Sequence, residues 1–78
     1  MDINLNIAED LMQAALEALL RKGYFAKKTS EYQIKVGAWN YWPEKGTITR
    51  DGVRGRHPET GLDALLKLLA DDRSLHRR

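Results

Sequence analysis

The spacing of the hydrophobic residues changes twice along this chain, and that change limits the possible folds more than any other feature. Residues 7–22 repeat with the helical period of about 3.6, residues 24–50 alternate with the strand period of about 2, and residues 60–71 return to the helical period. The order is therefore helix, strands, helix. We expect an α+β fold, in which an antiparallel sheet carries both helices on one face.

The ends of the elements carry local signals. Asn6 and Glu9 have the spacing of a capping box, and Gly23 follows the first helix. Thr60 and Asp63 repeat the cap-and-acid spacing before the second helix. The sequence predicts the following bounds: helix 7–22, strands 24–28, 32–42 and 47–50, helix 60–71 and a frayed tail 72–78. The alternative to a three-stranded sheet is a four-stranded one, with a further short strand at 53–56.

A chain of 78 residues without cysteine is expected to form a single small domain that packing alone must stabilise. The lack of cysteine also removes thiolate metal sites and fits a reducing compartment. No apolar run approaches the ~18 residues that span a bilayer, and the first residues do not resemble a signal peptide. We therefore expect a cytoplasmic protein without a membrane partner.

The segment WNYW, residues 39–42, places three large aromatic rings in four consecutive positions. In a continuous strand over 32–42, alternation puts Trp42 on the core face and puts Trp39 and Tyr41 on the opposite face. Nothing in so short a chain is left to cover that opposite face. The sequence thus predicts an open patch built on Trp39 and Tyr41.

The predicted hairpin loop supports this assignment. A three-residue loop over 44–46, with Gly46 as its left-handed residue, would pair Trp42 with Ile48 on the core face. A β-bulge at Gly37 would invert the assignment of the aromatic residues to the two faces. Without a bulge, the polar residues Asn40 and Arg50 would point toward the core, which is unfavourable. Another alternative is that Trp39 packs on the rim of the sheet or closes a dimer.

Basic residues concentrate in the same part of the chain. Residues 24–56 carry seven bases and three acids, a local charge of +4 in a chain whose net charge is +2. Such a field attracts phosphates or an acidic protein surface, although lysine and arginine also protect exposed sheet edges. The candidate partner-binding residues are Lys35, Trp39, Tyr41, Thr49, Arg50, Arg54 and Arg56.

Catalysis has little support in this sequence. The only histidines are His57 and His76, and no carboxylate pair or glycine-rich phosphate loop is spaced to act with His57. Two histidines so placed also make a poor metal site. We expect a non-enzymatic protein with no catalytic residues, no metal and no cofactor.

The segment NYWPEKGTITRDG, followed by GLDALLKLL, resembles small phage and prophage proteins with an aromatic-Trp-Pro-x-x-Gly-Thr segment before a Gly-Leu-rich final helix. The resemblance covers residues 36–69 and implies a mobile-element source. Small size and the absence of a catalytic pattern also make the chain similar to the anti-CRISPR class, whose members occupy and disable a host defence complex. The implied partner is a host protein or ribonucleoprotein, such as a CRISPR-Cas effector, bound by a monomer or weak homodimer.

Two functions therefore stay open. The first is inhibition of a host defence complex through a basic and aromatic sheet face, since the same residue types dominate protein interfaces. The alternative is a nucleic-acid-binding accessory protein, in which Trp39 and Tyr41 stack unpaired bases while cations hold phosphates.

Overall fold

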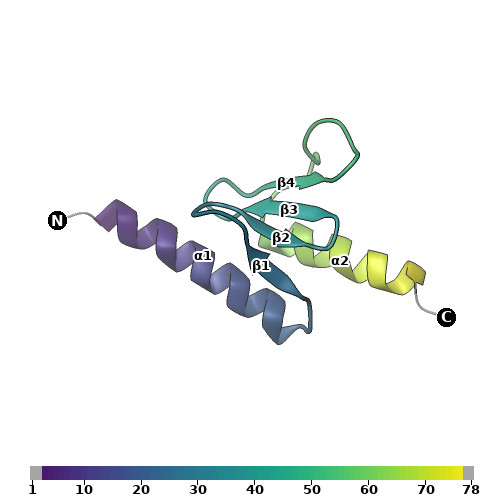
Figure 1. Ribbon diagram of the computed structural model, residues 1–78, viewed down its shortest axis with the longest axis horizontal. Helices are drawn as coiled ribbons and strands as arrows, with labels where there is room; N and C mark the ends of the chain where they lie inside the picture. The colour runs from purple at the N-terminus through teal and green to yellow at the C-terminus, as the bar shows by residue number, and fades with distance from the viewer. Residues whose placement is uncertain (1–2, 77–78) are drawn as a thin grey trace.

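The computed structural model describes the backbone of residues 3–76 and the side chains of residues 9–72. Two helices flank a run of strands in the chain (Figure 1). The elements are α1 (Ile3–Arg21), β1 (Ala26–Lys28), β2 (Ile34–Val36), β3 (Trp39–Trp42), β4 (Thr47–Arg50) and α2 (Leu62–His76). The predicted α+β fold with an antiparallel sheet is confirmed, and the sheet has four strands.

The strands lie in the order β1-β2-β3-β4, and each pairs antiparallel with its neighbour. A single hydrophobic core fills one side of this sheet and takes residues from both helices. Its buried members are Met12, Ala15 and Leu19 of α1, Ile34, Val36, Trp39, Tyr41 and Ile48 of the strands, and Leu65 and Leu69 of α2. Both helices therefore cover the same face of the sheet, as predicted.

The prediction of a continuous strand over 32–42 is wrong. The chain reverses at Gly37 and Ala38, and Val36 pairs with Trp39 across this two-residue turn. Gly37 has φ of +59°, at the first central position, where a type II′ hairpin turn requires glycine. This reversal, which replaces the predicted bulge alternative, creates the fourth strand of the sheet.

The predicted register between β3 and β4 is also wrong by one residue. Four residues, 43–46, form the loop, so that Trp42 pairs with Thr47 and Tyr41 with Ile48. Directly paired residues of an antiparallel sheet point to the same face. Tyr41 consequently joins Ile48 on the core face, and Trp42 lies on the opposite one.

The turn and the register together invert the predicted placement of the aromatic residues. Trp39 and Tyr41 are 6% and 4% exposed, whereas the half-buried Trp42 lies on the open face. Because side chains alternate with a period of two, a shift of one residue moves every side chain of a strand to the other face.

The first helix begins earlier than predicted. It starts at Ile3, so that Asn6 lies inside the helix and is not its N-cap. The residues before Asn6 include no glycine or proline that would delay the start. Among the strands, β4 matches its predicted range of 47–50, and β1 is shorter than the predicted 24–28.

The second helix starts two residues later than Thr60 and ends beyond the predicted range. Gly61 precedes it, and the carbonyl of Gly61 accepts a hydrogen bond from the Leu65 N–H at 3.1 Å. Residues 72–76, predicted to fray, continue the helix because they contain neither glycine nor proline. Residues 77–78 of the predicted tail lie outside the described residues.

Candidate binding face

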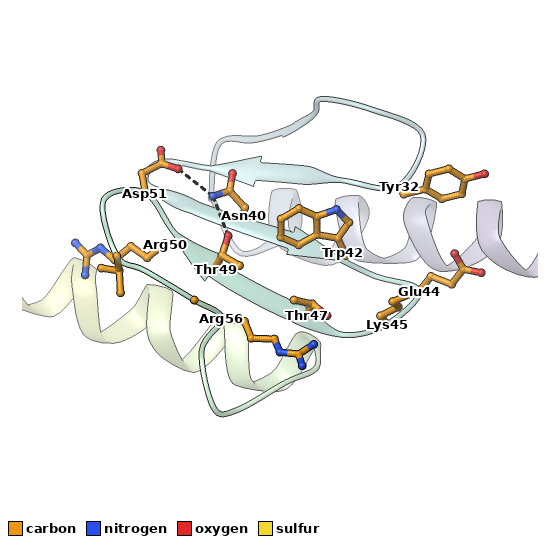
Figure 2. Close-up of a pocket in the computed structure, with 12 residues that line it drawn as sticks. Tyr32, Asn40, Trp42, Glu44, Lys45, Thr47, Thr49, Arg50, Asp51 and Arg56 are labelled. Atoms are coloured by element: carbon orange, nitrogen blue, oxygen red, sulfur yellow. Dashed lines mark hydrogen bonds between the residues drawn. The ribbon is translucent and has the colours of Figure 1, made fainter.

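The face of the sheet that points away from both helices carries an open depression of about 1120 Å³ (Figure 2). Strands β3 and β4 form its floor, and the adjoining loops form its rim. The lining residues are Tyr32, Asn40, Trp42, Glu44, Lys45, Thr47, Thr49, Arg50, Asp51, Val53, Gly55 and Arg56. We call this surface the open face.

Trp42 occupies the middle of the open face. Its indole is seen nearly face-on when the sheet is viewed from this side, so the ring lies along the sheet surface (Figure 2). Tyr32, which is 53% exposed, lies at one end of the depression, and Asp51 lies at the other (Figure 2). The ring system of Trp42 therefore offers a flat, accessible platform.

A polar network beside Trp42 holds the floor of the depression. Asn40 is 9% exposed, and its carbonyl oxygen accepts hydrogen bonds from Gln33 at 3.1 Å and from Lys35 at 3.3 Å. Its amide donates to Thr49 at 3.2 Å and to Asp51 at 2.9 Å. All four hydrogen-bonding positions of the Asn40 amide are thus used, which fixes its orientation and joins three segments of the chain.

Asp51 also forms an ion pair with Lys35, and the hydrogen bond from Lys35 is the largest cause of the lowered pKa of this carboxyl. The hydrogen bond from Asn40 lowers the pKa further. Asp51 therefore stays ionised at neutral pH and neutralises Lys35. This pair adds no net charge to the open face.

The low pKa of Asp51 predicts a pH dependence. Because the pKa is lower in the folded than in the unfolded chain, Asp51 stabilises the fold above the unfolded pKa, and this contribution is lost as pH falls through the folded pKa. The stability difference between the wild-type protein and Asp51→Asn should thus be constant near neutral pH and shrink below about pH 4. Urea denaturation across this range measures it, and a difference independent of pH would contradict the assigned interactions.

Two cations on the rim have no acidic partner. Within the part of the chain whose side chains are described, the only ion pair is Lys35 with Asp51, which leaves Lys45 and Arg56 unpaired. Arg56 is held next to β4, because it forms a β-bridge with Thr49. Both cations are exposed beside the depression and can meet an anionic group there.

The structure brings together part of the predicted site. Lys35 and Thr49 lie on the open face, and Arg50 and Arg56 line the depression. Arg54 is exposed but does not line it. The short strand considered at 53–56 is reduced to the single bridge made by Arg56.

Trp39 and Tyr41 are not contact residues of an open face, which corrects the sequence prediction. The indole N–H of Trp39 donates to Asp72 of α2 at 2.9 Å, and the guanidinium carbon of Arg50 lies 5.0 Å from the ring centroid. Burial raises the pKa of Tyr41, and the charge of Asp63 adds to this effect. Both aromatic residues therefore serve the core.

Sequence reasoning missed Trp42, Tyr32 and Lys45 as members of the open face. The informative signal was Asn40, which the continuous strand would have turned inward. An unpartnered amide in a core is unfavourable, so Asn40 favoured a register in which it shares the solvent face with Trp42.

Comparisons with family models, with curated proteins and with solved structures found no match to this chain. Among the described residues, no group of histidine, aspartate and glutamate side chains is arranged to hold a metal ion. No helix in the described part of the chain is long and apolar enough to cross a bilayer. The residues of the open face are thus the basis for a functional proposal.

Proposed function

We propose that this protein is a small, non-enzymatic binding protein that holds a macromolecular partner against its open face. The observation that carries this proposal is Trp42. It lies in the middle of the open face, with the unpaired cations Lys45 and Arg56 along one side of it, and it is not part of the buried core. Tryptophan and arginine are the residues that contribute most to binding when a partner covers them.

The rigidity of this surface also supports binding. Asn40 joins the strands beneath Trp42 through its hydrogen bonds, so the platform is held in place before a partner arrives. A surface that is already ordered loses less conformational entropy on association.

The wider role that we propose is inhibition of a host defence complex in the bacterial cytoplasm, with a CRISPR-Cas effector as the partner and the protein acting as a monomer or weak homodimer. The resemblance to small phage and prophage proteins supports this role. In a strain whose CRISPR-Cas immunity blocks a test phage, expression of the wild-type protein should restore plaque formation. Unchanged immunity in strains with several effector types would contradict the role.

The site itself is tested by the variant Trp42→Ala. Removal of the indole should weaken partner binding by at least about tenfold, because hot-spot truncations exceed about 1–2 kcal/mol. Binding to purified effector complexes and to oligonucleotides is measured by biolayer interferometry. The matched control is Phe25→Ala, since Phe25 is an aromatic residue that is 90% exposed and does not line the depression. Equal affinity of the two variants for every bound partner would place the site elsewhere.

A further inference from the structure

We propose that the ligand of the open face is a single-stranded nucleic acid, with one base stacked on Trp42 and its phosphates next to Arg56 and Lys45. This inference rests on the proposed function and names the component of a ribonucleoprotein partner that the open face contacts. It differs from the sequence prediction, which assigned base stacking to the two aromatic residues that are buried in the core.

The chemistry of the lining favours a nucleic acid over a protein surface. Among the residues that line the depression, Val53 is the only aliphatic one, and the others are aromatic, hydroxyl-bearing, amide, charged or glycine. Tryptophan, tyrosine and arginine are also enriched in protein interfaces, but methionine and phenylalanine, which are enriched there too, are absent from this lining. Planar rings beside cations are instead the combination that binds unpaired nucleotides.

The geometry of the ring suits a base. The indole of Trp42 lies along the sheet surface and faces the solvent, so a planar base can stack parallel to it (Figure 2). Tyr32 lies at one end of the same depression with 53% of its surface exposed, and it offers a second ring to a neighbouring base. Stacking bases on aromatic side chains of a sheet is an established mode of single-strand recognition.

The charge balance fits a polyanion. The lining includes three cations (Lys45, Arg50 and Arg56) and two anions (Glu44 and Asp51), and Asp51 is already paired with Lys35 outside the lining. The guanidinium of Arg50 lies over the Trp39 ring on the other side of the sheet, so Lys45, Arg56 and the remaining Glu44 leave a surplus of +1 on the open face. Such a surplus attracts phosphates and makes the affinity depend on salt, because bound phosphates release counterions.

A single strand fits better than a duplex. The bases of a duplex are stacked on each other and present only their edges, so they cannot reach a ring that lies flat on a sheet. A duplex would meet only the cations of the rim.

The hydrogen-bond network around Asn40 limits the ability of the open face to distinguish one base from another. Asn40 uses all of its hydrogen-bonding positions within the protein, so it cannot read a base edge. The hydroxyl groups of Thr47 and Thr49 are the remaining polar groups on the strand floor, and a hydroxyl can donate or accept. We therefore expect tight stacking with little preference among sequences.

Fluorescence anisotropy with labelled oligonucleotides tests this inference, with separate arms for single-stranded DNA, single-stranded RNA and duplex DNA. The wild-type protein should bind a single strand more tightly than the duplex, and the two single-strand arms show whether DNA or RNA is preferred. Trp42→Ala should weaken single-strand binding by about tenfold or more. Arg56→Glu should weaken binding and lower the slope of log affinity against log salt by about 1.

Two matched controls separate local from general effects. Arg54→Glu changes the net charge as Arg56→Glu does, but Arg54 does not line the depression. Phe25→Ala removes an exposed ring elsewhere. Each control should change single-strand affinity by less than about threefold, as surface substitutions usually do.

Failure of the inference can be told apart from failure of the proposed function. Absence of single-strand binding, or equal binding by the wild-type protein and Trp42→Ala, would overturn the nucleic-acid inference. If Trp42→Ala then still abolishes binding to an effector complex, the proposed function stands with a protein partner. If no partner of either class distinguishes Trp42→Ala from Phe25→Ala, both proposals fall.

Discussion

Trp39→Ala should lower the free energy of unfolding by about 3–5 kcal/mol, as large-to-small substitutions of buried aromatic residues do. Trp39 is 6% exposed in the core, and its indole N–H bonds to Asp72, so it fastens β3 to α2. Small domains have a total stability of about 5–15 kcal/mol, so this substitution should remove a large share of it. Urea denaturation followed by circular dichroism measures the change.

Trp42→Ala is the control for this prediction, because the two residues lie three positions apart in one strand and face opposite sides of the sheet. It should destabilise the protein much less, since Trp42 is not part of the core cluster. A second variant, Trp39→Phe, keeps most of the buried area and removes the indole N–H, so its effect should be intermediate. If Trp42→Ala proved the more destabilising substitution, the register predicted from the sequence would be right and the observed one wrong.

Gly46→Ala is expected to have the second large effect. Gly46 has φ of +77°, which is unfavourable for a residue with a Cβ by about 1–2 kcal/mol. A Cβ at this position would also lie 3.1 Å from the backbone nitrogen of Gly61, whose N–H donates to the Gly46 carbonyl at 2.8 Å. The substitution should therefore push the start of α2 away from the β3–β4 loop as well as strain the loop.

Gly52→Ala separates these two causes. Gly52 has a similar φ of +81°, but no atom lies within 4 Å of its added Cβ. Thermal unfolding should show a smaller loss of stability for Gly52→Ala than for Gly46→Ala. Amide hydrogen exchange should also be faster at Gly61 in Gly46→Ala alone, and equal behaviour of the two variants would show that the contact with Gly61 is unimportant.

The sequence was sufficient for the element types because these depend on local patterns. Helical and alternating periods of hydrophobic residues predicted two helices around an antiparallel sheet, and the structure confirms this class of fold. The sequence was less informative about where the helices and strands begin and end. Asn6, for example, has the chemistry of an N-cap and still lies within α1. A residue can act as an N-cap only if the residues before it are not helical, and nothing in residues 3–5 prevents them from being helical.

The candidate site was predicted only in part. The local excess of bases correctly drew attention to Lys35 and Arg56, which the structure places at one surface, whereas the guanidinium of Arg50 lies over Trp39. The two-residue turn at Gly37 was missed because Gly-Ala lacks the Asn-Gly or Asp-Gly pair that marks most short hairpins. Without that turn, the pairing partners of the aromatic residues could not be assigned.

By itself, the sequence determined that this chain forms helices around a sheet and that a basic, aromatic segment lies in the strands. Only the tertiary structure decided which aromatic residues face the solvent. The segment 39–42 has large rings on both faces of its strand, so either register buries aromatic surface and the alternation favours neither. Packing of Trp39 against α2 and the reversal of the chain before it settle the register, and they leave Trp42 as the accessible ring.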